Sequence, residues 1–239
     1  MIFIIRGDSP AVLVDAPAKG DYYNKPAVVH ALWEMQHGKC CYCERKLPDK
    51  GHLKAVEHFA PKAIFKGFRN EWTNLLLACS QCNGEKSDAF PWVLSTNDQE
   101  DKVLYLRGKA VAAAIIDPSS ENPEAHIDFD FSGEEWMDRF GVVMAKTDSA
   151  LGANTITTVG IHAQFYSDLR WSYYIKVIRP FYGQLLEAVR DKNALRTQVH
   201  RNSFERLMDP DQEFAGYVRA FARRKRLHEA PVNVTIPGL

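Results

Sequence analysis

The first part of the chain alternates short apolar runs with turn-forming residues. The opening run, residues 1–6, is short and apolar, which is typical of a strand. A loop with two prolines follows, and from Lys25 to His37 apolar residues recur at helical spacing. We therefore predict a strand, a loop and an amphipathic helix before residue 38. The residues on the apolar side of this helix are Val28, Val29, Leu32 and Trp33.

A helical pattern returns after residue 150. It is clearest over residues 161–190, and Pro180 lies within that stretch. Because proline lacks an N–H donor and clashes with the preceding turn, we expect this helix to kink or split there. A second amphipathic stretch, residues 204–227, ends in the basic run Arg223–Arg226. We predict that residues 151–239 form a mainly helical region that docks on a partner. For the basic run, a solvated helix end and a phosphate contact are both open interpretations.

Between these regions, residues 91–150 alternate apolar runs such as Val103–Leu106 and Ile127–Phe131 with proline-containing turns. We interpret this part as an acidic, β-rich insert or linker. Residues 98–148 contain five basic and twelve acidic side chains, so we do not expect this part to bind nucleic acid.

Four of the five cysteines form two Cys-x-x-Cys pairs, Cys40 with Cys43 and Cys79 with Cys82. Zinc takes four thiolate or imidazole ligands in a tetrahedron, and two such pairs can close a structural zinc site. His37 and His52 would replace a cysteine only if this spacing were misleading. The fifth cysteine, Cys41, is expected to be a small buried residue.

Polar residues suited to metal-assisted hydrolysis lie between and after these pairs. Glu57 and His58 are adjacent, Asn74 precedes the second pair, and Asn83 follows it directly. Together they supply an oxygen ligand, a base, an orienting amide and a second oxygen ligand, as phosphodiester hydrolysis requires. The competing interpretation is a zinc ribbon that only displays a surface, with His58 as a structural histidine.

The order of these residues resembles the HNH endonuclease superfamily. That family has a ββα-metal core with a histidine base and a central asparagine, often within a four-cysteine zinc framework. The sequences of residues 38–44, 56–62 and 74–79, which surround these residues, resemble the HNH component of Septu and retron anti-phage systems. The resemblance implies an α+β fold. Residues 1–90 would form an N-terminal segment and an HNH ββα-metal core, and a four-cysteine zinc site would stabilise that core.

The resemblance also implies roles for single residues. His58 would be the base, Glu57 and Asn83 would bind catalytic Mg²⁺ or Mn²⁺, and Asn74 would fix the loop and the imidazole. Lys86 would approach a phosphate of the substrate. The chain departs from the commonest family pattern in two places, because Glu57 stands where aspartate is usual and Asn83 stands where histidine is usual.

Composition limits the class of protein. The chain has 239 residues, 46% of them hydrophobic and 25% charged, and no apolar run approaches the roughly 20 residues of a membrane span. The opening residues do not resemble a signal peptide, and the cysteines suit a reducing compartment, so we expect a cytoplasmic protein without membrane contact.

The 30 basic and 30 acidic residues give a formal net charge of zero. A nuclease that binds nucleic acid without a partner normally carries a net positive charge. We therefore expect a partner to supply part of the substrate binding. The resemblance implies an ABC-type ATPase as that partner, and a retron setting would add a reverse transcriptase with its RNA–DNA. The alternatives are a zinc-binding adaptor that does not cleave, and a freestanding restriction-type nuclease. DNA is the favoured substrate, with RNA left open.

Overall fold

The fold was determined as a computed structural model. It describes residues 1–17, 19–49, 51, 53–94, 104–106, 109–132 and 140–227, so His52 and Val103 lie outside the described residues. The chain divides into two compact units. The first consists of Met1–Ile127 and Met144–Ile161, and the second contains Asp128–Val143 and the residues from His162 onward. These bounds differ from the three predicted parts, because most of the 91–150 stretch belongs to the first unit.

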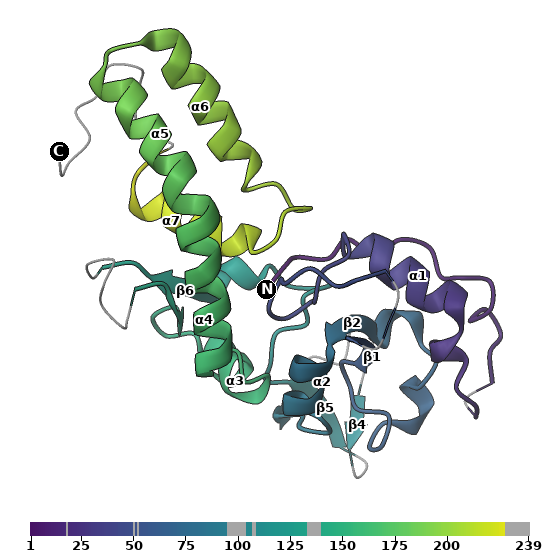
Figure 1. The fold of residues 1–239 in the computed structure, drawn as a ribbon. Coiled ribbons are helices and arrows are strands. Elements are labelled where there is room, and N and C mark those ends of the chain that lie inside the picture. Colours follow the sequence, from purple (N-terminus) through teal and green to yellow (C-terminus); the bar gives the residue numbers. More distant parts are fainter. Residues whose placement is uncertain are drawn as a thin grey trace. The chain divides into compact units, whose positions relative to one another are not determined.

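The centre of the first unit is a ββα arrangement (Figure 1). Strands β1 (Lys54–His58) and β2 (Leu75–Cys79) pair antiparallel, with His58 opposite Leu75 and Lys54 opposite Cys79. Helix α2 (Ser80–Lys86) follows β2 directly. All five residues of β2 are buried, as expected for a strand covered on both faces. The predicted ββα core is confirmed, and so is the α+β fold class.

Only part of the prediction for the residues before residue 38 is confirmed. The helix is confirmed as α1 (Pro26–Met35), with Pro26 in its first turn and Val28 and Leu32 buried. The strand predicted for residues 1–6 is wrong. That segment is not paired in a ladder, and Ile4 N donates one backbone hydrogen bond to Pro118 O at 2.8 Å. Alternating apolar residues alone cannot make a strand where no partner strand lies alongside.

The remainder of the first unit contains a three-stranded sheet in the order β3-β5-β4. Helix α3 completes this part of the unit. The ranges are β3 (Trp92–Leu94), β4 (Leu104–Leu106), β5 (Lys109–Ala113) and α3 (Ala150–Thr158). Short 3₁₀ turns lie between the main elements at η1 (Tyr22–Asn24), η2 (Lys66–Phe68), η3 (Trp72–Asn74) and η4 (Pro123–Ala125). The 91–150 stretch therefore contains short strands, as its alternating pattern indicated.

The chain passes between the units through a pair of strands, β6 (Ile127–Asp130) and β7 (Val142–Ala145). The second unit is otherwise helical. Its helices are α4 (Gln164–Tyr173), the π-helical segment η5 (Tyr174–Ile178), α5 (Arg179–Arg190), α6 (Ala194–Arg206) and α7 (Ala215–Arg224).

The chain does not split at Pro180, because α4, η5 and α5 follow one another without a non-helical residue, and a π-helical turn directly precedes the segment with Pro180 in its first turn. The stretch predicted as one amphipathic segment over residues 204–227 is divided between α6 and α7. Pro210 and the left-handed Phe214 (φ 51°) interrupt it. The core of the unit is mainly aromatic, with Tyr174, Phe204, Tyr217 and Phe221 buried together.

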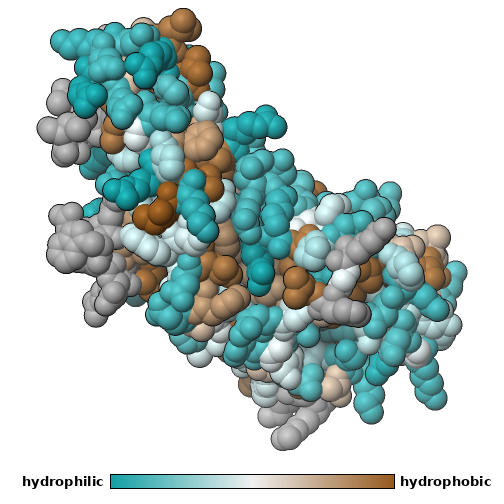
Figure 2. Space-filling view, in the orientation of Figure 1, coloured by the Kyte–Doolittle hydropathy of each residue, from teal (hydrophilic) through white to brown (hydrophobic). Residues whose placement is uncertain are grey.

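Helices α5 and α6 run side by side as a helical hairpin (Figure 1). The hairpin surface is mostly hydrophilic in Figure 2, with some hydrophobic groups near its far end. On α6, Leu195 and Val199 are exposed. Among the described residues, no helix is both long and apolar enough to cross a bilayer.

Candidate metal centre and active site

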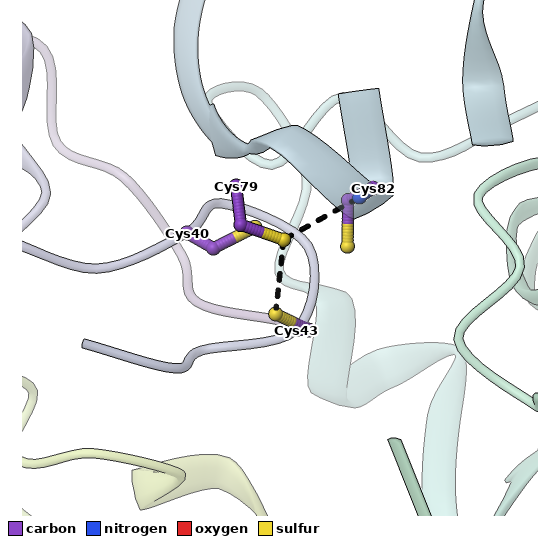
Figure 3. Close-up of side chains that lie close together, drawn as sticks. All are labelled: Cys40, Cys43, Cys79 and Cys82. Atoms are coloured by element: carbon purple, nitrogen blue, oxygen red, sulfur yellow. Dashed lines mark hydrogen bonds between the residues drawn. The ribbon is translucent and has the colours of Figure 1, made fainter. Parts of the chain in front are cut away.

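The four predicted cysteines come together at one place. Cys40 and Cys43 lie in the turn before β1, Cys79 ends β2, and Cys82 is in α2. Their sulfur atoms all lie within 4.8 Å of one another, and all four residues are buried (Figure 3). The Sγ atoms of Cys43 and Cys79 are 3.9 Å apart. Zn–S bonds of about 2.3 Å in a tetrahedron place sulfurs roughly 3.8 Å apart, so the cluster fits a structural zinc ion.

Hydrogen bonds among the four clustered thiols lower the pKa values of Cys40 and Cys79, while the pKa values of Cys43 and Cys82 are raised. Burial would raise the pKa of Cys40, but hydrogen bonds with neighbouring thiols bring it well below its ordinary value. Burial raises the pKa of Cys41 well above that value, and its backbone N–H donates to Leu77 O at 3.0 Å. Cys41 therefore packs the turn against β2 as a neutral thiol, as its sequence context indicated.

Gln36, directly after α1, fixes the turn that contains Cys40 and Cys43. Its Nε2 donates to Lys39 O at 3.0 Å and to Leu77 O at 2.7 Å, and its Oε1 accepts from Leu77 N at 2.7 Å. One buried amide thus joins the cysteine turn to β2. The sequence analysis missed this residue, because a glutamine at the end of a helix carries no distinctive signal.

His58, the predicted base, is the last residue of β1 and is buried. Its Nε2 lies 2.9 Å from Arg69 O. A carbonyl oxygen only accepts hydrogen bonds, so Nε2 carries the hydrogen and Nδ1 is the nitrogen that can take a proton. Burial, with smaller contributions from the charges of Lys62 and Lys86, lowers the pKa of His58 to about 4. The imidazole is therefore neutral at pH 7, as a general base must be.

Asn74 closes the loop that follows His58. Its Oδ1 accepts from Ala60 N at 2.8 Å, and its Nδ2 donates to Ala60 O and Phe68 O, each at 3.0 Å. Phe68 precedes Arg69, whose carbonyl holds the imidazole. Among the described residues, Asn74 bonds to the backbone of the loop and not to the imidazole ring, so it links to His58 only through that loop.

Glu57 and Lys86 form an ion pair inside the first unit. Lys86 Nζ lies 2.7 Å from Glu57 Oε1, with side-chain exposures of 0% and 3%. Tyr42 O–H donates to the same oxygen at 3.2 Å, and Lys86 Nζ also donates to His58 O at 3.1 Å. Burial raises the pKa of Glu57, and the charge of Lys86 opposes that rise. The structure thus differs from the expectation for Lys86, because a fully buried, paired ammonium is out of reach of a substrate phosphate.

Asn83 is half-buried on α2, one helical turn before Lys86. Among the described residues, its side chain makes no hydrogen bond, so its amide oxygen is available to a ligand. The structure therefore brings Glu57, His58 and Lys86 into mutual contact, with Asn83 on the adjoining helix. Carboxylate and amide oxygens are the donors that Mg²⁺ and Mn²⁺ favour, so the chemistry of this set fits such an ion.

The sequence analysis also missed the segment of residues 19–23, whose Tyr23 ring covers the His58 ring. Asn70 holds it, with Nδ2 donating to Pro17 O at 2.8 Å and to Gly20 O at 3.1 Å, and Oδ1 accepting from Tyr23 N at 3.1 Å. The Tyr23 ring then meets His58 edge-on, with centroids 4.6 Å apart. No local pattern marks this packing, since it joins segments almost 50 residues apart in the chain.

A cavity of about 580 Å³ adjoins the loop after His58. Phe59, Ala60 and Asn74 line one side, and Asp117 and Ser119 are among the residues that line the other. A ligand in this cavity would contact the loop that positions the imidazole, and it would meet both the Arg6 and the Asp117 side chains.

The comparisons with known proteins agree with this geometry. Residues 40–89 match the model of the HNH endonuclease family, so this segment is an HNH endonuclease domain.

More particularly, the chain is similar to Septu protein PtuB of Bacillus thuringiensis, with 32% identity over 136 residues that cover 53% of this chain and 46% of that protein. It is 24% identical to Septu protein PtuB of Bacillus mycoides over 162 residues, covering 62% of this chain and 51% of that protein. The chain spans about half the length of these two relatives. The predicted resemblances to the HNH superfamily and to PtuB are confirmed.

A third relative carries another name. The chain is 29% identical to Septu protein PtuA of Bacillus mycoides over 172 residues, covering 64% of this chain but only 23% of that protein.

Proposed function

We propose that this chain is a metal-dependent nuclease that hydrolyses phosphodiester bonds in nucleic acid, DNA above RNA, as the effector of an anti-phage defence system of the Septu type. The observation that carries the proposal is the state of His58. Its imidazole lies at the end of β1 within the HNH ββα core, is neutral at pH 7, and is held at Nε2 so that Nδ1 can accept a proton.

The chain's own groups would act in a fixed order. His58 Nδ1 takes a proton from a water molecule, and the resulting hydroxide attacks phosphorus in line. Asn74 and Arg69 O keep the ring aligned during that transfer. A divalent ion held by Glu57 and Asn83 would stabilise the charge that develops on the phosphate and the leaving oxygen. The four-cysteine zinc site would keep β2 and α2 in place.

The test is cleavage of plasmid DNA and of total RNA by the purified chain, with Mg²⁺ or Mn²⁺ and with zinc content measured in parallel. We expect about one zinc per chain and cutting that His58→Ala reduces by roughly 10²-fold or more. His30→Ala is the matched control, since His30 lies in the same unit with 59% of its side chain exposed. Full cutting by His58→Ala would contradict the assignment of the base.

We also propose that an ABC-type ATPase works with this chain. The PtuA relative supports this proposal, since it contains a segment similar to this chain joined to a much longer remainder. Co-expression of the chain with an ATPase from its own locus should give a complex that survives size-exclusion chromatography. If a reverse transcriptase and RNA–DNA elute with the chain instead, the retron setting is the correct one.

The alternatives predict other results. The non-catalytic adaptor would be favoured if zinc-loaded protein cleaves no nucleic acid, either alone or with a co-expressed ATPase. The structural argument for it is the buried ion pair, because Lys86 occupies the carboxylate of Glu57. Efficient sequence-specific cutting by the isolated chain would favour a freestanding restriction-type nuclease.

A further inference from the structure

The first unit contains two buried lysine–glutamate pairs with different surroundings. Lys86 and Glu57 are 2.7 Å apart, and Lys39 and Glu44 are 3.5 Å apart, with side-chain exposures of at most 3% in both pairs. Burying a charged pair is costly, and a hydrophobic pair of the same volume is often as stable or more so. A buried pair beside a candidate active site therefore calls for an explanation beyond stability.

The surroundings of the Lys86 ammonium are made of oxygen atoms. It contacts the carboxylate of Glu57 and the backbone carbonyl of His58, the candidate base. Tyr42, between Cys40 and Cys43 in the zinc turn, holds the same carboxylate oxygen. A carboxylate and a backbone carbonyl are also groups that a hard divalent cation selects as ligands. The ammonium thus lies where oxygen atoms converge, next to the base.

We propose that Lys86 is a tethered counter-ion that neutralises Glu57 in the metal-free protein, and that the divalent ion binds by displacing it. This inference rests on the proposed function, because it takes Glu57 as the ligand of the catalytic ion. The Lys86 ammonium already lies 2.7 Å from Glu57 Oε1, so a divalent ion binding to the same oxygen would be strongly repelled by it. Each binding event therefore includes the cost of moving the ammonium, while Tyr42 keeps the carboxylate oriented.

The first test measures thermal unfolding of the zinc-loaded chain in a buffer without added divalent ions and then with Mn²⁺. Lys86→Met keeps the length of the side chain but leaves Glu57 buried and unpaired. We expect the melting temperature to fall by roughly 10 °C without Mn²⁺. Mn²⁺ should then restore at least half of that loss, and it should stabilise the wild-type chain much less. An equal Mn²⁺ effect on both proteins would overturn the proposal.

The second buried pair supplies the matched control. Lys39→Met removes a buried ammonium from Glu44 in the same unit, near the zinc turn. Glu44 also pairs with the N-terminal ammonium of Met1 at 2.7 Å, so we expect a smaller loss of melting temperature, which Mn²⁺ does not restore. Recovery of Lys39→Met to the same extent would show a general effect of Mn²⁺ on the unit and would contradict a specific site at Glu57.

A binding measurement keeps the proposal testable if Lys86→Met folds poorly. In the Glu57→Gln, Lys86→Met double variant no buried charge remains at this place, so the fold should recover without metal. Titration followed by the Mn²⁺ EPR signal should show binding about tenfold tighter in Lys86→Met than in the wild type, and lost in the double variant. Unchanged Mn²⁺ binding in the double variant would refute the role of Glu57. These readouts do not depend on cleavage, so a failure of the proposed nuclease activity is seen separately.

Discussion

The HNH core and the helical second unit are held together by different forces. In the core, four cysteines, a buried ion pair and the amides of Gln36, Asn70 and Asn74 connect segments with little regular structure. In the second unit, aromatic residues from several helices pack against one another. The core depends on a few directional contacts at exact positions, whereas the helical unit depends on the burial of many interchangeable apolar groups. The two units should therefore respond differently to the same kind of damage.

Loss of zinc should have the largest effect on stability, and it should show the difference in stability between the two units most clearly. Cys82→Ser removes one of the four ligands, and metal binding supplies much of the folding free energy of small cysteine sites. We expect residues 40–89 to lose protection in hydrogen exchange measured by mass spectrometry, while the helices α4–α7 keep theirs. Equal loss in both units would show that they fold as one.

The next largest effect is expected in the helical core. Phe221 is fully buried and contacts Phe131, Tyr174 and Tyr182. Phe221→Ala should cost about 4 kcal/mol of the unfolding free energy, through lost burial and the cavity left behind. Denaturant titration checks the size, and zinc analysis should give the wild-type content. A reduced zinc content would mean that the core depends on the second unit.

Asn74→Ala tests the loop that positions the base. It removes three hydrogen bonds, takes the side-chain partners from the buried backbone groups of Ala60, and leaves the carbonyl of Phe68 with only the N–H of Glu71 at 3.3 Å. We expect a loss of about 3 kcal/mol in stability and a larger relative loss in cleavage, because Arg69 O no longer holds the imidazole. Ser120→Ala, on the far side of the adjoining cavity, is the control and should change neither.

The smallest effect is expected for the link between the zinc turn and Glu57. Tyr42→Phe removes only the hydroxyl that donates to Glu57, and should cost about 1 kcal/mol of unfolding free energy. If this hydrogen bond orients the carboxylate, Mn²⁺ affinity should fall severalfold at unchanged zinc content. Mn²⁺ affinity equal to that of the wild type would show that the Tyr42 hydroxyl does not orient Glu57 for metal binding.

Prediction from the sequence succeeded where the chemistry is local. The spacing of Cys40, Cys43, Cys79 and Cys82 marked the metal cluster, because a tight turn presents both thiolates of each pair. Pro180 marked the place where the helical hydrogen bonding changes, because a proline has no N–H to donate and a π-helical turn precedes it. It failed for residues 1–6, where an apolar run proved to be an unpaired extended segment. The predicted roles of Glu57, His58 and Asn83 in cleavage stay predictions.

By itself, the sequence determined which residues could bind zinc, which histidine could act as a base, and which stretches would be helical. These properties depend on residue type and on spacing of a few positions along the chain. Only the tertiary structure decided that Lys86 is buried against Glu57, that Tyr23 covers the His58 ring, and that Gln36 and Asn70 fix the loops. Those contacts join residues far apart in the chain, and their charges and hydrogen bonds acquire partners only when folding excludes water around them.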